Sequence, residues 1–214
     1  TDERIEQFEF NRAEGWEEDY RKYRENWSKY PRQQYVSDYP ILVDIELSSL
    51  CNLKCPMCYT ITEEFKKKVC TQLMDTKLFQ KLADEMAGKV SAVRLSLRGE
   101  ATLHPDFISC IRYCKDKGIR EVSFLTNSAK LNREYFIQAA EAGADWITIS
   151  IDGVGKQYED IRKPLKFEDT LKKIKDIYSI KKKNKWNKPV IKVQGIWPAI
   201  RDNPSEYYNT FAPY

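Results

Sequence analysis

Three cysteines, Cys51, Cys55 and Cys58, stand close together with the spacing C-x-x-x-C-x-x-C. Cysteine thiolates hold iron–sulfur clusters, and a [4Fe–4S] cube has four irons to be ligated. Three protein ligands leave one iron open, and an open coordination position is where a metal site can do chemistry. The clustering therefore favours a reactive iron–sulfur centre over a framework of disulfides.

The cysteines follow an apolar stretch, and strands then alternate with helices along the chain, which predicts a parallel sheet with right-handed crossovers. The cysteine loop comes just after the first strand, where active sites of parallel βα folds are built. The expected strands are 41–47, 92–98, 121–126, 146–151 and 190–196, and the expected helices are 75–87, 105–117, 132–142 and 167–183.

The cysteine motif resembles that of the radical S-adenosylmethionine (radical SAM) superfamily, C-x-x-x-C-x-Φ-C, with Met57 at the Φ position. The resemblance covers roughly residues 41–200. It implies an α/β fold, a partial (β/α)6 barrel that is truncated here after about five strands. We expect residues 1–40 to form an N-terminal helical extension, 41–200 the core, and 201–214 the start of a C-terminal part.

Two further motifs extend the resemblance. Residues 98–101 read R-G-E-A where the family carries G-G-E-P, which implies that Gly99 and Glu100 receive the amino group of SAM. Residues 150–153 resemble an S-x-D-G segment, frequent in members with an additional C-terminal iron–sulfur (SPASM-like) domain. This second match implies that Ser150 lies near the ribose or carboxylate of SAM.

The family pattern also implies that Arg162 faces the SAM carboxylate, because a guanidinium matches carboxylate geometry. A surface ion pair of Arg162 with Asp160 or Glu159 is the alternative. Three more residues are candidate contacts to the cluster, the cofactor or the substrate: Tyr59, Asn127 and Gln194.

The reaction implied by the resemblance is reductive cleavage of SAM at the cluster. It yields a 5′-deoxyadenosyl radical that abstracts hydrogen from a substrate, with a peptide, protein or sugar favoured. A one-electron donor such as a flavodoxin or ferredoxin would be the partner. Two alternatives stay open: a non-catalytic zinc- or cluster-binding module, and an RNA-modifying radical SAM enzyme.

Composition narrows these choices. The chain has 214 residues, 42% hydrophobic and 32% charged, which is typical of one globular domain with its own core. Its net charge of +4 is too small to indicate nucleic-acid binding by itself. The sequence has no apolar run long enough for a bilayer and a polar N-terminus unlike a signal peptide, so we expect a cytoplasmic protein without membrane contact.

Several other residues are expected to be structural. Cys110 and Cys114 lie one helical turn apart and should pack in the core, and His104 should cap or pack a helix. The basic segment 181–188 should be a solvated loop before the last strand, and Cys70 has no assigned role.

An aromatic stripe predicts a helix after Gly15 that ends at Pro31. This helix should pack on the body of the protein, with docking of a partner as the alternative. The members of the stripe are Trp16, Tyr20, Tyr23, Trp27 and Tyr30.

Overall fold

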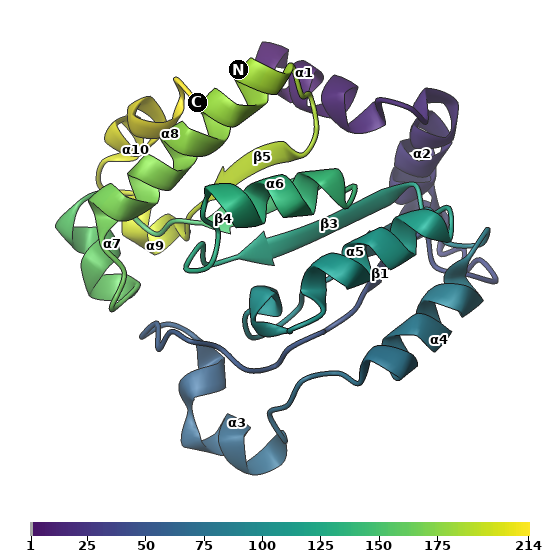
Figure 1. Cartoon of the computed structure of the whole chain (residues 1–214), viewed down its shortest axis with the longest axis horizontal. Helices are drawn as coiled ribbons and strands as arrows, with labels where there is room; N and C mark the ends of the chain where they lie inside the picture. Colours follow the sequence, from purple (N-terminus) through teal and green to yellow (C-terminus); the bar gives the residue numbers. More distant parts are fainter. Residues whose placement is uncertain (1) are drawn as a thin grey trace.

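A computed structural model of the chain describes residues 2–214 and contains one parallel sheet with strand order β1-β2-β3-β4-β5 (Figure 1). The sheet is open, with β1 and β5 at its edges, so the predicted α/β fold and partial barrel are confirmed. The strands are β1 (Leu42–Asp44), β2 (Ala92–Arg94), β3 (Glu121–Thr126), β4 (Trp146–Ser150) and β5 (Val190–Gln194).

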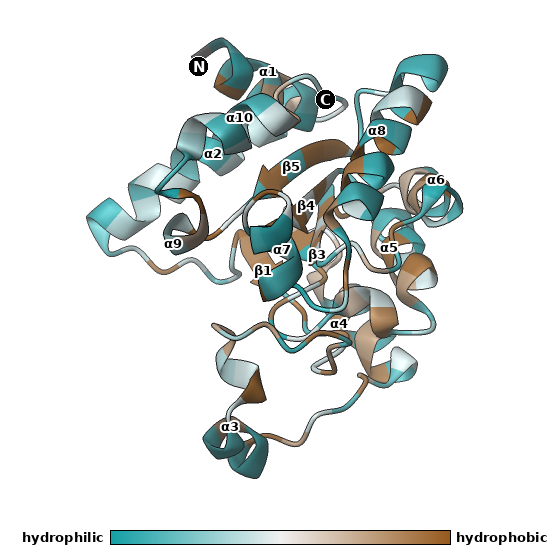
Figure 2. Ribbon diagram, turned by 90° about the vertical axis from the view of Figure 1, so that its left-hand side faces the viewer, coloured by the Kyte–Doolittle hydropathy of each residue, from teal (hydrophilic) through white to brown (hydrophobic). Residues whose placement is uncertain are grey.

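The four long helices that follow the strands lie on one face of the sheet and bury its apolar side chains. Hydropathy colouring shows apolar strands in the middle and hydrophilic surfaces on the outer helices (Figure 2). Residues such as Val93, Phe124 and Ile147 are fully buried in this core. These helices are α4 (Thr76–Met86), α5 (Phe107–Asp116), α6 (Arg133–Glu141) and α8 (Phe167–Asn184).

Two of these helices begin at an Asp or Asn side chain of the kind that favours a helix N-terminus. Asp75 Oδ1 accepts from the Leu78 amide at 3.0 Å, and Asn132 Oδ1 accepts from the Tyr135 amide at 2.8 Å. The predicted start of α5 at Pro105 is wrong, because the helix begins two residues later, after a turn.

Six short elements escaped the sequence prediction because each is too short to show apolar periodicity. One of them, α3, does carry a cap, since Thr62 Oγ1 accepts from the Phe65 amide at 3.3 Å. They are η1 (Tyr59–Ile61), α3 (Glu63–Lys68), η2 (Ala101–Leu103), α7 (Lys156–Ile161), α9 (Trp197–Ile200) and α10 (Pro204–Phe211).

The N-terminal segment forms two helices, α1 (Asp2–Ala13) and α2 (Glu17–Gln33), of which the sequence predicted only the second. The prediction that Pro31 ends this helix is wrong, because Pro31 lies inside the last turn of α2. There its missing N–H removes a single backbone bond. The helix ends instead at Gln33, and the following residue, Gln34, has left-handed backbone angles.

The aromatic stripe of α2 packs against the start of the sheet, which confirms the packing interpretation for three of its members. Trp16, Tyr20 and Tyr23 are buried in a cluster with Ala92, the first residue of β2. Trp27 remains 46% exposed. The two helices therefore cover the amino end of the sheet.

Arg12 of α1 closes this end of the sheet through a buried ion pair. Its Nε and Nη2 atoms donate to the Glu121 carboxylate at 2.9 and 2.8 Å, and its guanidinium lies 4.6 Å from the ring centre of Trp146. Burial disfavours the charged Arg12, but the hydrogen bonds and charge of Glu121 outweigh burial and raise the pKa of Arg12. We call Arg12, Glu121 and Trp146 the floor of the sheet.

The charge run at residues 181–188 is largely exposed to solvent, as predicted, but only part of it is a loop. Residues 181–184 belong to α8. Lys181 Nζ donates to the Asn187 carbonyl at 2.7 Å, and Lys188 Nζ donates to Asp145 Oδ1 at 2.8 Å. These two lysines tie the end of α8 and the start of β5 to the amino end of the sheet.

Cys110 and Cys114 lie in the core as predicted, and burial raises the pKa of each thiol to about 12. Because alkylation requires the thiolate, we expect iodoacetamide to spare both cysteines in the folded protein and to label the exposed Cys70. Peptide mass spectrometry after timed labelling measures the rates. Equal rates at Cys110 and Cys70 would contradict this packing.

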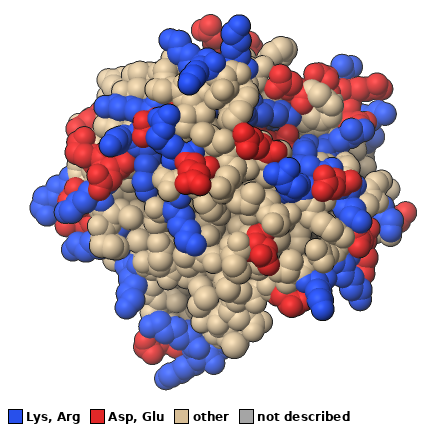
Figure 3. Space-filling model, viewed as in Figure 1, with Lys and Arg blue, Asp and Glu red and all other residues tan. Residues whose placement is uncertain are grey.

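The helices within residues 2–214 are too short or too polar to cross a bilayer. Acidic and basic side chains are interspersed over the face seen in Figure 3, with no continuous basic surface on it. Lysines gather at the lower end of that view, in the last turn of α3. This distribution gives no support to an extended nucleic-acid interface on that face.

Candidate functional site

The cysteine loop leaves the carboxyl end of β1 and is fixed at its start by a short antiparallel contact. The Ser49 amide donates to the Gln72 carbonyl at 3.1 Å, and the Gln72 amide donates to Ser49 Oγ at 2.8 Å. Within the loop, the Cys58 amide donates to the Cys55 carbonyl at 2.9 Å. The loop therefore makes a tight turn that brings two of the cysteines onto the same side of the site.

The three cysteines differ in depth: Cys51 is exposed, Cys55 is buried and Cys58 is intermediate. Partial burial raises the pKa of Cys51 although the residue as a whole is exposed, and burial raises the pKa of Cys55; the Glu100 charge adds to the effect at Cys51, and the other thiolates of the loop raise both values. A bound cation removes both penalties, because it stabilises thiolates directly. The electrostatics of the loop thus suit a metal centre.

The Cys51 sulfur also has hydrogen-bond donors around it. The Leu53 amide lies 3.4 Å from Cys51 Sγ, and Asn127 Nδ2 lies 3.9 Å from it. Cys58 Sγ lies 2.9 Å from Thr60 Oγ1. Such donors tune iron–sulfur centres, so the donor set fits a thiolate-held cluster. Within residues 2–214 no three Cys, His, Asp or Glu side chains lie close enough together to hold one metal ion.

Asn127 joins the end of β3 to the cysteine loop. Its Nδ2 donates to Asn52 Oδ1 at 2.8 Å, and its Oδ1 accepts from the Ala129 amide at 2.9 Å. The side chain is 4% exposed. Asn127 therefore helps to position the cysteine loop.

Glu100 is the polar centre of the site, although it is only 2% exposed. Its Oε1 accepts from the Thr102 hydroxyl at 2.6 Å and the Thr126 hydroxyl at 2.7 Å, while the Asn127 amide donates to Oε2 at 2.7 Å. The carboxylate therefore links the loops after β2 and β3. Its Oε2 has one protein donor and retains a lone pair for another.

Gly99 allows the segment after β2 to cross the cysteine loop closely. Its φ is +59°, and a Cβ at this position would lie 2.6 Å from the Leu50 carbonyl and closer still to that of Ser48. The sequence predicted a close approach to a ligand here. The approach seen is to the backbone that leads into the cysteines.

We therefore expect Gly99→Ala to lower the free energy of unfolding by about 2 kcal/mol, since a Cβ adds both left-handed strain and a clash with backbone. Gly88→Ala is the matched control, because Gly88 has φ +71° but open space around it and incurs only the strain. Urea denaturation of the two variants measures the difference. Equal losses would show that crowding at Gly99 is unimportant.

Arg98 and Glu46 form a pair at the mouth of the sheet that the sequence did not predict. Arg98 Nε and Nη2 donate to the Glu46 carboxylate at 2.9 and 2.6 Å, and the Arg98 amide donates to the same group at 2.9 Å. Arg98 stands where the family has glycine. A side chain held in an ion pair therefore replaces a residue that has no side chain. The pattern R-G-E-A alone does not indicate that Arg98 pairs with Glu46, 52 residues earlier in the chain.

Arg162 pairs with Asp152, not with the two neighbours that the sequence offered. Its Nε and Nη2 donate to Asp152 Oδ2 at 2.7 and 2.6 Å, and the Ile196 amide donates to Asp152 Oδ1 at 2.9 Å. Asp160 and Glu159 pair with lysines instead. The pair is close enough to Cys55 for its charges to act on that thiol, where Arg162 lowers the pKa and Asp152 raises it.

The remaining candidates are spread along the same edge of the sheet. Ser150 and Gln194 are register partners at the carboxyl ends of β4 and β5. Tyr59 is 58% exposed and packs edge-on against Phe65. None of these three side chains has a hydrogen bond to the other predicted site residues within the described part of the chain.

His104 is structural, as the sequence indicates. Its Nε2 lies 2.9 Å from the Met74 carbonyl, and its Nδ1 accepts from the Asp106 amide at 3.1 Å. Both ring nitrogens are therefore occupied, which removes His104 as a fourth ligand in the zinc alternative.

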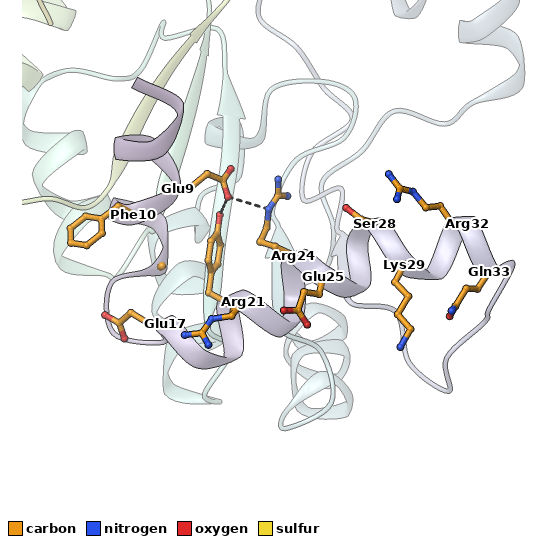
Figure 4. Close-up of a pocket in the computed structure, with 12 residues that line it drawn as sticks. Glu9, Phe10, Glu17, Arg21, Arg24, Glu25, Ser28, Lys29, Arg32 and Gln33 are labelled. Atoms are coloured by element: carbon orange, nitrogen blue, oxygen red, sulfur yellow. Dashed lines mark hydrogen bonds and ion pairs between the residues drawn. The ribbon is translucent and has the colours of Figure 1, made fainter. Parts of the chain in front are cut away.

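An open hollow of about 930 Å³ lies between α1 and α2, at the opposite end of the sheet from the cysteines. Figure 4 shows its walls, where Glu9 bridges Arg24 and the hydroxyl of Tyr20. This hollow is therefore separate from the candidate site, which lies at the carboxyl ends of the strands.

Comparison with known proteins identifies the same region. Residues 45–192 match the model of the radical SAM superfamily. The chain is 29% identical over 131 residues to the Fe-coproporphyrin III synthase of Methanosarcina barkeri, covering 60% of this chain and 31% of that protein. It spans roughly a quarter to a third of the length of the curated relatives it matches.

Solved structures share the fold at low identity. SuiB of Streptococcus suis bound to its precursor peptide SuiA has a TM-score of 0.60 and 15% identity, covering 89% of this chain and 42% of that one. The structure of anSMEcpe with bound AdoMet has a TM-score of 0.60 and 17% identity, covering 80% and 48%.

The family uses a [4Fe–4S] cluster and SAM, and its matched region contains the cysteine loop, Glu100 and Asn127. The match extends over more than half of the chain, and it agrees with the strand order and with the position of the cysteines after β1. The chain is therefore an enzyme that belongs to the radical SAM superfamily.

Proposed function

We propose that Cys51, Cys55 and Cys58 hold a [4Fe–4S] cluster at which SAM is cleaved to begin hydrogen abstraction from a substrate. The observation that carries this proposal is the junction of the cysteine loop with the ends of β2 and β3. Asn127 contacts the loop, and Glu100 contacts Asn127. These contacts connect the carboxyl ends of β1, β2 and β3 around the loop that carries the three cysteines.

When bound, the cluster and SAM supply one-electron cleavage of the cofactor's C–S bond, and the protein supplies binding and orientation. Glu100 Oε2 has a lone pair for the ammonium of SAM, a charge-assisted contact. Its other oxygen is held by the Thr102 and Thr126 hydroxyls. Glu100 therefore has a fixed direction before the cofactor arrives.

Arg162 supplies the complementary charge for the SAM carboxylate. Its Nε and Nη2 hydrogens contact Asp152, which leaves the Nη1 hydrogens for a ligand. The arginine side chain is 13% exposed and its partner 1%, so the pair is held in place by burial. Ser150 and Gln194 lie at the same carboxyl edge of the sheet. We place the ribose of SAM near Ser150, and Gln194 at the mouth of the barrel.

The substrate that we favour is a peptide, a protein or a sugar, and the electron donor is a flavodoxin or ferredoxin. Support for the peptide comes from the likeness to SuiB, which was solved with a precursor peptide. Support for the donor comes from the reaction, because cleavage of SAM consumes one electron that the chain does not carry.

The test is anaerobic reconstitution of the full protein with iron and sulfide, followed by addition of SAM and dithionite. We expect a broad visible absorption that changes with SAM, and deoxyadenosine as a product seen by chromatography. A colourless protein that retains one zinc, or a loaded protein that never forms deoxyadenosine, would refute the proposal.

A further inference from the structure

The turn that follows Asn127 has an unusual backbone. Ser128 has φ +67°, in the left-handed region that residues other than glycine rarely adopt. Within residues 2–214, Gln34 and Lys185 share this feature, but each directly follows a helix, where left-handed angles are common. Ser128 lies instead two residues after the end of β3 and is 1% exposed. A strained conformation in such a place persists only where the surrounding structure holds it.

Lys173 of α8 supports this turn through its side chain. Its Nζ donates to the Ser128 carbonyl at 2.7 Å and to the Ala129 carbonyl at 2.9 Å. The two carbonyls belong to the residue with left-handed angles and to the residue after it, so one ammonium fixes two successive peptide groups. Lys173 is partly buried, whereas its neighbour Lys172 is exposed. The carbonyl oxygens thus replace water that the Lys173 ammonium loses on burial.

The turn is also bonded to the cysteine loop, through the side chain of Asn127. Asn127 Nδ2 donates to Asn52 Oδ1 at 2.8 Å and lies 3.9 Å from Cys51 Sγ. At the other end of the same amide group, Asn127 Oδ1 accepts from the Ala129 amide at 2.9 Å. Because the side-chain amide is bonded at both ends, a shift of Ala129 moves the group that contacts Asn52. The turn therefore connects α8 to the loop that carries the cysteines.

We propose that Lys173 is a positioning residue of the cysteine loop, because it holds the left-handed turn at Ser128 in the conformation that directs Asn127 toward the loop. The inference rests on the proposed function in treating this loop as the one that binds the cluster. The hydrogen bonds of the Lys173 ammonium within the described residues go to Ser128 and Ala129, so Lys173 acts through the turn and not by contact with the cysteines.

The experiment is amide hydrogen exchange, read by mass spectrometry, on the reduced full chain without cofactor. In Lys173→Met we expect the amides of residues 51–58 to exchange at least about tenfold faster than in the wild type, the effect of losing charge-assisted hydrogen bonds on a local opening. The reporting amides in this segment are those of Leu53 and Cys58, which have hydrogen-bond acceptors within the loop. Amides of α2, at the other end of the sheet, should exchange as in the wild type.

Lys172→Met is the matched control, since Lys172 precedes Lys173 on the same helix and is exposed. It should leave the exchange of residues 51–58 unchanged. Three outcomes would overturn the inference. The first is equal exchange of this segment in the two variants, and the second is faster exchange confined to residues 127–131. The third is equal acceleration of every segment, α2 included, which would show a loss of global stability and no specific effect on the loop.

Ser128→Gly tests the route through the turn. Glycine adopts left-handed angles without the steric cost that serine has, so a turn with glycine depends less on its support. Lys173→Met should therefore accelerate the exchange of residues 51–58 by a smaller factor in the Ser128→Gly background than in the wild type. Such non-additivity is the measure of coupling between the two residues. The same factor in both backgrounds would contradict a route through the backbone of Ser128.

The reconstituted protein provides a readout at the cluster itself. Lys173→Met should release iron to a chelator faster than Lys172→Met, by about the factor seen in hydrogen exchange, because the same opening exposes the cysteines. Equal release rates would count against the positioning role. Deoxyadenosine formation by the wild type is measured separately. If it fails while hydrogen exchange shows the coupling of Lys173 to residues 51–58, the proposed function is at fault and the positioning role is not.

Discussion

Replacing Cys55 by serine is expected to abolish cluster loading and to reduce deoxyadenosine formation to the level of a protein-free control. Two thiolates cannot retain a cluster that needs three, and Cys55 is the buried member of the three cysteines that we propose as ligands. Iron and sulfide content, visible absorption and product chromatography measure the effect.

Cys70→Ser is the matched control for this prediction. Cys70 is exposed and lies outside the three-cysteine motif, so its loss should leave iron content and deoxyadenosine formation as in the wild type. If Cys55→Ser kept its cluster and turnover, the assignment of the three ligands would be wrong. If Cys70→Ser also lost iron, Cys70 would be a ligand and the zinc-type alternative would regain support.

Replacing Arg12 by methionine is expected to destabilise the protein by about 3–5 kcal/mol, because it leaves the Glu121 carboxylate buried without a partner. For a chain of this size the loss corresponds to a fall of roughly 10 °C in the melting temperature. Thermal and urea unfolding of the protein without cofactor, under oxygen-free conditions, measure it.

The double variant Arg12→Met/Glu121→Met separates charge from packing. If the penalty is the stranded carboxylate, removal of both charges should restore most of the lost stability. Lys156→Met is the control for an ordinary ion pair: Lys156 and Asp160 are exposed, so loss of their pair should leave the unfolding curve almost unchanged. A double variant as unstable as the single one would show that Arg12 acts mainly through contact with the aromatic rings.

The sequence predicted those parts of the fold that local patterns determine. The strand at 121–126 and the helix starting at residue 167 follow from runs of apolar residues, and Asp75 and Asn132 cap their helices through contacts three residues away. The cysteine loop was predicted for a similar reason, since its ligands are neighbours in the chain.

The parts that were missed depend on partners distant in sequence. Arg12 contacts a glutamate 109 residues later, and Glu46 contacts an arginine 52 residues later. Charged side chains give no indication of which opposite charge they will meet, because many are available. The pairing of Arg162 illustrates the limit, since the two nearest carboxylates were the wrong ones.

Glu100 is a site residue that the sequence identified, but most of its contacts could not be predicted. The family resemblance predicts its contact with SAM, whereas three of its protein donors come from Thr102, Thr126 and Asn127. These contacts arise only when β2 and β3 lie side by side. Its buried network is thus a product of the sheet, not of the motif.

The floor of the sheet has a consequence for where this protein can be divided. Similarity to the family begins at residue 45, and a boundary drawn by homology would discard both α1 and α2. A polypeptide trimmed at that point would lose the counter-charge of Glu121 and would expose to water Trp146 and the part of the sheet that Trp16, Tyr20 and Tyr23 cover. We therefore expect that a fragment must retain α1 and α2, which precede the region of family similarity, to keep this end of the sheet covered.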